Sequence, residues 1–224
     1  VVAGSVAQLI LNKIGVEIFA YVSSVGSLRL NKSYNNLDLN SIDDNIVRCP
    51  DVDLSKSMIK LIEDIKKSGD TIGGVISCVA KGLPIGIGEP VFDKLHAEIG
   101  KGMLSINAVK AFKLGFENQD ISSSLGSQVN DIIIDKTGKT KTNFSGGIQG
   151  GISNGNDIYC EISFKPVSTL MINQESINLN GDKIILKAKG RHDSCVVPRA
   201  VPIVEAMMAL TILDHYLISK SNNI

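Results

Sequence analysis

Five side chains that carry charge or exchange protons gather near the C-terminus. The stretch GRHDSCVVPRAVP, residues 190–202, contains Arg191, His192, Asp193, Cys195 and Arg199, although the whole chain has only four arginines. A guanidinium can grip a carboxylate or phosphate through two parallel hydrogen bonds. A carboxylate held beside it stays ionised and can accept a proton or orient a neighbouring group. The stretch therefore predicts either an anion site with acid–base chemistry or a structural Arg191–Asp193 pair where a strand meets a helix.

Two further segments contain residue types that are suited to binding an anion. Residues 145–155, SGGIQGGISNG, contain paired glycines, which let a backbone approach a ligand and present N–H groups. No G-K-[ST] follows, so this is not a Walker loop, and a tight turn between strands is the alternative. The run KPVST, residues 165–169, places Lys165 before Pro166 and two hydroxyls. Such a strand end can hold a phosphate, although an exposed lysine before a turn has the same sequence.

Histidine and cysteine give no metal or nucleophile pattern. His96 and His215 lie in helical sequence without a partner at metal-ligand spacing, so we assign both to structure. No Ser-His-Asp or Cys-His arrangement is visible. The four cysteines are far apart, and we predict buried free thiols rather than disulfides or a zinc site: Cys49, Cys78, Cys160 and Cys195.

Composition suits one large domain or two intertwined halves, and we expect one domain over residues 1–224. The chain is 43% hydrophobic and has no net charge, so no overall field recruits nucleic acid or an anionic membrane. Aromatic residues make up 4% and Trp is absent, which argues against a base-stacking surface. Residues 202–218 are the most apolar, and we predict a buried or interface helix with Pro202 in its first turn.

Helical and strand-like segments alternate along the chain. Helices are expected at 1–14, ended by Gly15, at 53–70, ended by Gly69, and at 91–104. Strands are expected at 16–26, 109–116, 157–165 and 182–190, and at 71–90, where glycines break the pattern. Residues 131–142 are expected to form a strand that leads into a turn, and residues 31–50 a loop or excursion. In 157–165 apolar residues alternate with Tyr159, Glu161, Ser163 and Lys165, which predicts one polar face. The interleaving favours an α/β or α+β fold.

Five blocks together give the chain a strong resemblance to the chorismate synthase family. They are GEPVFDKLHAEIGKGMLSINAVKAFKLG (88–115), GSQVND (126–131), SGGIQGGISNG (145–155), FKPVSTL (164–170) and KGRHDSCVVPRAVPIVEAMMALTILDHYL (189–217). The resemblance implies an α+β fold, a β-α-β sandwich that is incomplete here, assembled as a cytoplasmic homotetramer. It also implies 1,4-elimination of phosphate from 5-enolpyruvylshikimate 3-phosphate, a step of aromatic amino-acid biosynthesis that needs reduced FMN. In some members NADPH reduces the flavin.

The resemblance also assigns roles to individual residues. Matching motif positions imply flavin contacts from Asn107, Ala108, Gly150, the run Lys165, Pro166, Val167, Ser168 and Thr169, and Arg191. Asp193 matches the acidic position that assists proton removal, and both Arg191 and Asp193 are expected at the substrate. Ser194 stands where proline is common in the family, which removes a backbone restraint just after Asp193.

Motifs of the family's N-terminal region do not occur in this sequence. Neither Gly-Glu-Ser-His nor Arg-Ser-Ser-Ala-Arg is found, and the sequence opens within a helical pattern without an initiator Met. We therefore expect a C-terminal portion that binds FMN weakly and does not turn over alone. The alternative is a non-catalytic remnant of the same fold that binds flavin or only takes part in assembly.

Overall fold

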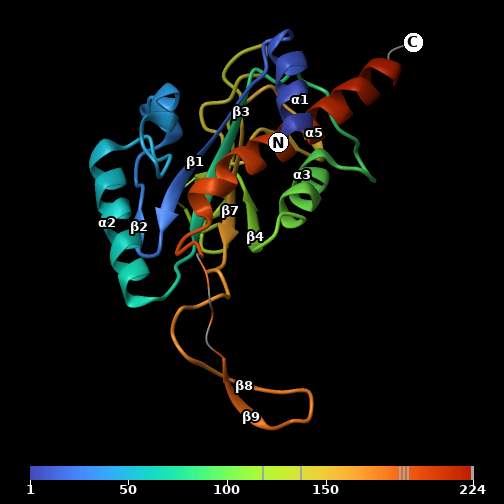
Figure 1. The fold of residues 1–224 in the computed structure, drawn as a ribbon. Helices are drawn as coiled ribbons and strands as arrows, with labels where there is room; N and C mark the ends of the chain where they lie inside the picture. Colours follow the sequence, from blue (N-terminus) through green and yellow to red (C-terminus); the bar gives the residue numbers. More distant parts are fainter. Residues whose placement is uncertain (118, 137, 187, 189, 191, 223–224) are drawn as a thin grey trace.

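A five-stranded antiparallel sheet forms the centre of the molecule (Figure 1). The computed structural model describes residues 1–222 apart from 118, 137, 187, 189 and 191. The strand order is β2-β1-β3-β7-β4. The strands are β1 (Glu17–Val25), β2 (Leu28–Arg29), β3 (Gly74–Lys81), β4 (Val109–Leu114) and β7 (Ile158–Phe164). Apolar β-branched residues recur in β1, β3 and β7, which suits strands buried in a packed layer.

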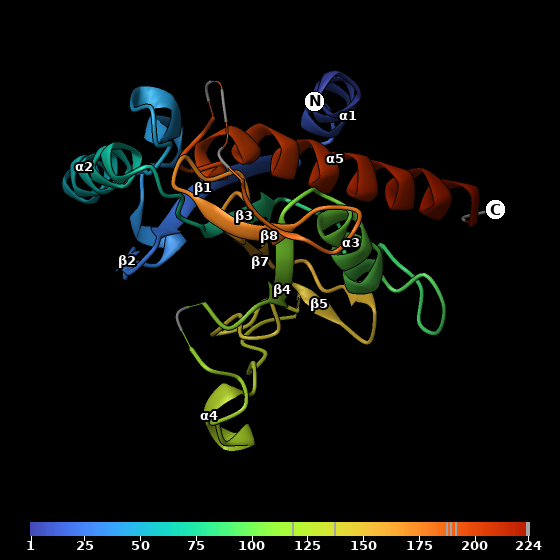
Figure 2. The same ribbon diagram turned by 60° about the horizontal axis from the view of Figure 1, so that its bottom comes forward.

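Three helices cover one face of this sheet (Figures 1 and 2). They are α1 (Val2–Asn12), α3 (Leu95–Leu104) and α5 (Val197–Asn222). α5 lies across β1 and β3 and packs against α1 and α3. The crossing with α1 is close, because a Cβ built on Gly4 would lie 2.3 Å from the Cβ of Ala206. The main apolar core lies between these helices and the sheet.

The other face of the sheet is covered by irregular chain. Residues 31–50 form two short 3-10 helices, η1 (Tyr34–Asn36) and η2 (Leu39–Asp44), which pack on Tyr21, Val79 and Tyr159. α2 (Val52–Ser68) follows and ends at Gly69, whose φ of 77° is left-handed, as predicted. The side chains of 157–165 alternate as predicted. However, Tyr159 and Glu161 on the polar face are buried, because this second layer covers them.

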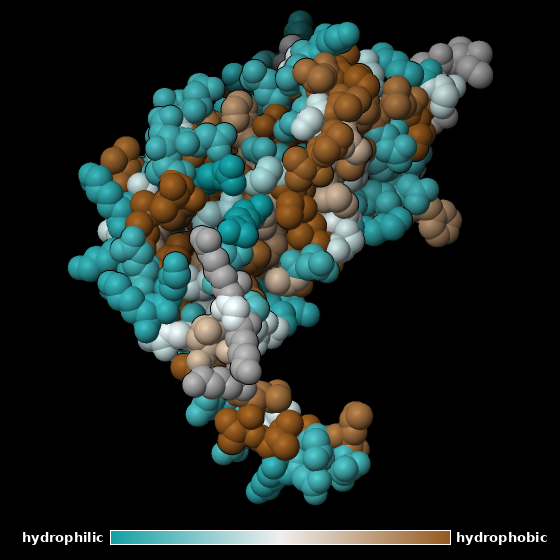
Figure 3. Space-filling view, in the orientation of Figure 1, coloured by the Kyte–Doolittle hydropathy of each residue, from teal (hydrophilic) through white to brown (hydrophobic). Residues whose placement is uncertain are grey.

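Two hairpins and a short helix lie outside the main sheet. β5 (Ile148–Gln149) pairs with β6 (Ile152–Ser153), and β8 (Gln174–Ile177) pairs with β9 (Lys183–Leu186). α4 (Gly126–Val129) lies on the opposite side of the sheet from α5 (Figure 2). The β8–β9 hairpin projects from the body and exposes Ile177, Leu179 and Ile185 (Figure 3).

Several predicted boundaries are wrong. α3 begins at Leu95, not residue 91, and residues 131–142 form an isolated bridge between Ile133 and Thr140 rather than a strand. α1 ends at Asn12 with Lys13 as its C-cap, and Gly15 lies beyond it. The last helix begins at Val197, so Pro202 lies in its interior and not in its first turn. The ring of Pro198 occupies the first turn instead, where its missing N–H costs nothing.

The expected burial of the last helix and of the cysteines is confirmed. α5 is long and apolar enough to cross a membrane by length and composition, but it packs against α1, α3 and the sheet. All four cysteines are free and buried. In the described part of the chain, no group of His, Cys, Asp and Glu side chains is arranged to hold a metal ion.

Candidate functional site

Two of the predicted flavin-binding segments meet at one end of the sheet. Ala108 precedes β4 and Lys165 follows β7, and the two strands are antiparallel with Val109 opposite Phe164. The N–H of Lys165 donates to the carbonyl of Ala108 at 2.9 Å. Ala108 has a φ of 70°, a conformation that is uncommon for a residue with a side chain. Such outliers concentrate where surrounding structure imposes them, often at ligand sites.

Residues 71–73 tie a third segment to this end of the sheet. The Thr71 hydroxyl donates to the carbonyl of Val167 at 2.6 Å, and the Ile72 N–H donates to the carbonyl of Ser194 at 2.8 Å. Glycine is needed at position 73 for residues 71–73 to lie this close to the end of β7, since a Cβ there would lie 2.3 Å from the carbonyl oxygen of Phe164. The segments around residues 108, 165 and 194 are therefore held together by backbone contacts.

Hydrogen-bond donors are exposed where these segments meet. Lys165, Ser168 and Asn107 are exposed, and Thr169 is half-buried. Within the described residues, Lys165 has no acidic partner within salt-bridge distance. An ammonium, an amide and two hydroxyls are suitable donors for the oxygens of an anionic ligand.

Asp193 lies beside this cluster and pairs with Arg199 from the first turn of α5. The Oδ2 atom of Asp193 lies 3.0 Å from Nη1 of Arg199. The Asp193 side chain is 39% exposed and that of Arg199 is 70% exposed. The carboxylate thus remains accessible while an arginine fixes its direction. Arg191, the partner suggested by the sequence, lies outside the described residues.

Gly150 is the glycine of the loop 145–155 beside which the structure leaves open space. Gly146 and Gly147 pack on the backbones of Gly115 and Asp157, so both are structural. Gly150 has a φ of 63°, is exposed, and has no atom within 4 Å of a built Cβ. This arrangement fits the predicted role of Gly150, with the rest of the loop acting as its support.

Asp131 anchors that loop. Its carboxylate accepts the N–H groups of Phe144 and Ser145, both at 2.8 Å, and the Thr142 hydroxyl at 2.7 Å. Partial burial acts to raise the pKa of Asp131, but these hydrogen bonds outweigh it and lower the pKa below its usual value. The last residue of the GSQVND block is therefore a brace for the glycine-rich loop.

Gly150 and Ala108 lie at opposite ends of α3. The carbonyl of Gly151 accepts the first N–H of the helix, from Leu95, at 2.9 Å. The helix ends at Leu104, three residues before Asn107. Its ten residues span about 15 Å, so one extended ligand would have to lie along α3 to touch both ends.

Comparison with known proteins assigns the family. The chorismate synthase family model matches residues 1–217. The chain belongs to the chorismate synthase family.

Curated chorismate synthases are similar over this whole chain. The protein of Phocaeicola vulgatus is 54% identical over 228 residues, which cover 100% of this chain and 63% of that protein. The protein of Cytophaga hutchinsonii is 55% identical over 224 residues, covering 99% of this chain and 62% of the relative. The chain thus spans a little under two thirds of the length of these chorismate synthases.

A crystal structure of chorismate synthase has the same fold. It superimposes with a TM-score of 0.79 at 24% identity, covering 97% of this chain and 61% of the other. The α+β class expected from the sequence is confirmed.

Sequence reasoning missed the residues that hold this candidate site together. Thr71 and Ile72 act through short contacts with residues far along the chain, for which the sequence contains no signal. Arg199 was noticed only as part of an arginine-rich stretch. Asp131 had a better signal, since an acidic residue shortly before a glycine-rich loop is suited to accept its N–H groups.

Proposed function

We propose that this chain supplies the flavin-holding portion of a chorismate synthase, which eliminates phosphate from 5-enolpyruvylshikimate 3-phosphate to give chorismate. The observation that supports it best is the meeting of Ala108, Lys165 and Ser194 at one end of the sheet, held by hydrogen bonds of 2.9 and 2.8 Å and by Thr71. These are the segments that the resemblance assigns to reduced FMN and substrate. We also propose that residues 1–224 behave as one domain.

The residues present fit an anionic flavin. Lys165 is exposed without an acidic partner in the described part of the chain, so its ammonium is available to a negatively charged group. Gly150 leaves open space beside a backbone in the left-handed conformation. Lys165 to Thr169, with Asn107 and Ala108, would hold the cofactor at one end of α3, and Gly150 at the other. Reduced FMN, when bound, supplies electron density that assists departure of phosphate without net oxidation.

Asp193 takes the acid–base role in this proposal. Its Oδ2 atom lies 3.0 Å from Nη1 of Arg199, and this ion pair gives the carboxylate a defined direction. The carboxylate can then accept the proton that the elimination removes from substrate. Arg191 would add a second guanidinium for the substrate's anionic groups, and lies outside the described residues.

The remaining expectations belong to the same proposal. We propose a cytoplasmic homotetramer, with NADPH as a reductant of the flavin. A second candidate is a non-catalytic flavin-binding or assembly form of the fold.

One pair of proteins tests the proposal. The first is the chain itself, and the second is a completed chimera, in which the part of the P. vulgatus relative that this chain does not match is joined to it. Both are mixed with reduced FMN and 5-enolpyruvylshikimate 3-phosphate, and chorismate is followed by absorbance. We expect turnover by the completed chimera and none by the chain. Turnover by the chain would refute the need for the additional region, and a folded, flavin-binding but inactive chimera would favour the second candidate.

A further inference from the structure

A proline in the interior of α5 removes a hydrogen bond from the first turn of that helix. α5 begins at Val197 and contains Pro202. In a regular α-helix the N–H of residue 202 donates to the carbonyl of residue 198, but proline has no N–H. A proline ring also crowds that carbonyl, and such crowding kinks helices. The first turn of α5 is therefore held less firmly by the helix itself than the later turns are.

Arg48 donates to this carbonyl from a distant part of the chain. Its Nη1 atom lies 2.8 Å from the carbonyl oxygen of Pro198, and its Nε donates to Oδ1 of Asp43 at 2.8 Å. The Arg48 side chain is 35% exposed and that of Asp43 is 82% exposed. An ion pair with so exposed a carboxylate contributes little to stability. The bond from a charged donor to the carbonyl of Pro198 is the stronger contact.

The backbone of Arg48 is fixed before its side chain reaches α5. Its φ of 61° is left-handed, which is uncommon for a residue with a side chain. Val47 and Cys49 on either side are buried in the main core, and the carbonyl of Arg48 accepts the N–H of Val22 at 2.9 Å. The Asn45 amide closes the same turn by donating to the carbonyl of Cys49 at 2.8 Å. The guanidinium therefore extends from a base that the core holds in place.

The residue after Pro198 is Arg199, the partner of Asp193. The two side chains meet at 3.0 Å, between Nη1 and Oδ2. One planar peptide unit joins the carbonyl of Pro198 to the nitrogen of Arg199, so a contact that fixes this carbonyl also fixes the backbone that carries the arginine. The segment of Asp193 is held separately, through the N–H of Ile72 on the carbonyl of Ser194 at 2.8 Å. Movement of the first turn would therefore shift Arg199 relative to Asp193.

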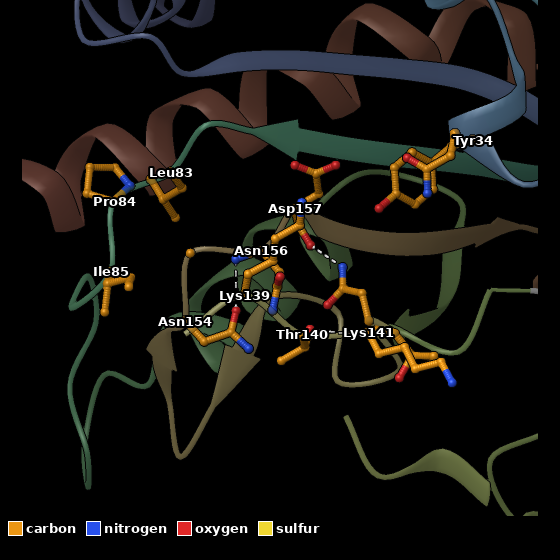
Figure 4. Close-up of a pocket in the computed structure, with 14 residues that line it drawn as sticks. Tyr34, Leu83, Pro84, Ile85, Lys139, Thr140, Lys141, Asn154, Asn156 and Asp157 are labelled. Atoms are coloured by element: carbon orange, nitrogen blue, oxygen red, sulfur yellow. Dashed lines mark hydrogen bonds between the residues drawn. The ribbon is translucent and has the colours of Figure 1, made fainter. Parts of the chain in front are cut away.

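We propose that Arg48 is a positioning residue, which replaces the hydrogen bond that Pro202 removes and thereby holds Arg199 against Asp193. Its effect on the reaction rests on the proposed function, in which Asp193 is the acid–base residue. The largest cavity of the described residues, about 670 Å³, opens on the face of the sheet away from α5 (Figure 4). Neither Arg48 nor Pro198 lines it, so substitutions at residue 48 leave its lining unchanged.

A mutant cycle on the 224-residue chain tests the replaced hydrogen bond. Arg48→Met keeps an apolar stem without the donor, so it should lower the midpoint of urea unfolding by about 0.5 M or more. Pro202→Ala restores an N–H for the carbonyl of Pro198. In this background the loss caused by Arg48→Met should fall to about half or less, because the two donors serve one acceptor.

Arg29 provides the matched control for this cycle. It pairs with Glu161 on the sheet at 3.1 Å, so the loss caused by Arg29→Met should be the same with proline or alanine at position 202. Equal losses from Arg48→Met in the two backgrounds would overturn the proposal. If Arg48→Met does not fold, Pro202→Ala should restore folding in the double variant, and a double variant that stays unfolded would also overturn it.

Kinetics of the completed chimera test the positioning of Asp193. Arg48→Met should lower kcat for chorismate formation by about tenfold or more, with KM and FMN affinity within about twofold. Added to Asp193→Asn, it should lower kcat little further, because it acts through that carboxylate. An unchanged kcat in Arg48→Met, or losses that multiply in the double variant, would overturn the proposal. An inactive chimera, or a normal rate in Asp193→Asn, would count against the proposed function instead, while the urea cycle still decides whether Arg48 replaces the missing bond.

Discussion

Asp193 and Arg199 form an ion pair of 3.0 Å between the segment after the last hairpin and the first turn of α5. The pair connects the proposed acid–base residue to α5, the longest helix, which packs on β1 and β3. Arg191, the partner of Asp193 that sequence proximity suggested, lies outside the described residues. The contact gives the accessible carboxylate a defined direction without burying it.

The first prediction concerns Asp193 itself. In the completed chimera, Asp193→Asn should lower the rate of chorismate formation by about a hundredfold or more, because a positioned acid–base group has an effect of that size. FMN affinity should stay within a few-fold, since the side chain is not assigned to hold the cofactor. Steady-state kinetics and flavin titration measure the two effects separately. An unchanged rate would leave Asp193 as a structural partner of Arg199.

Gly150 gives a second prediction with a close control. Gly150→Ala places a side chain at a φ of 63°, which costs about 1 kcal/mol or somewhat more in stability. Gly181→Ala, in the β8–β9 turn, should cost a similar amount because its φ is 88° and its surroundings are equally open. Only Gly150→Ala should also weaken FMN binding in the completed chimera. Equal FMN affinity in the two variants would remove Gly150 from the flavin site.

Asp131 should stabilise the glycine-rich loop in a pH-dependent manner. Asp131→Asn weakens three hydrogen bonds to an ionised group and should lower the free energy of unfolding by about 2 kcal/mol near pH 7. Asp64→Asn, on the exposed side of α2, should change it by less than about 0.5 kcal/mol.

The sign of the pH effect follows from the lowered pKa of Asp131. Its contribution is complete above the usual aspartate pKa of about 3.9 and is lost as the pH falls through the lower folded-state pKa. The difference between wild type and Asp131→Asn should therefore shrink when urea unfolding is repeated below about pH 4. A constant difference across this range would show that the charge of Asp131 is not what stabilises the loop.

Glu205 of α5 should have the opposite pH dependence. Burial raises the pKa of Glu205, although it accepts the N–H of Ala20 at 2.9 Å. Its ionisation therefore costs stability as the pH rises from about 4 through the raised folded-state pKa. Glu205→Gln keeps an accepting oxygen without the charge, so it should gain stability relative to wild type between acid and neutral pH. Glu63→Gln, exposed on α2, is the control, and a parallel response of the two variants in urea unfolding would contradict the account.

The sequence predicts the elements that follow from local pattern. α2 has an apolar stripe and a left-handed glycine at its end, and both features act within a few residues. The alternation in β7 is likewise local. The burial of Tyr159 and Glu161 was not predictable, because it depends on residues 31–50 folding over the second face of the sheet.

The candidate site was likewise only partly predictable from the sequence. Residue types indicated Lys165, Asp193 and the glycine-rich loop 145–155 one by one, and the family resemblance singled out Gly150 and assigned all of them to one site. What brings the segments of Lys165 and Asp193 together is Thr71, Ile72 and the backbone of Ala108, through contacts between residues distant in sequence. A sequence pattern does not show which residues far apart along the chain lie close together in the fold. These positioning residues are therefore identified only in the structure.

The central claim is that these segments hold one anionic flavin, and Lys165 tests it most directly. FMN is titrated by fluorescence into the completed chimera and its variants Lys165→Gln and Lys183→Gln, both at exposed lysines. Loss of a charge-assisted contact should weaken FMN binding about tenfold or more in Lys165→Gln, with little change in Lys183→Gln. Equal FMN affinity in all three proteins would contradict the account.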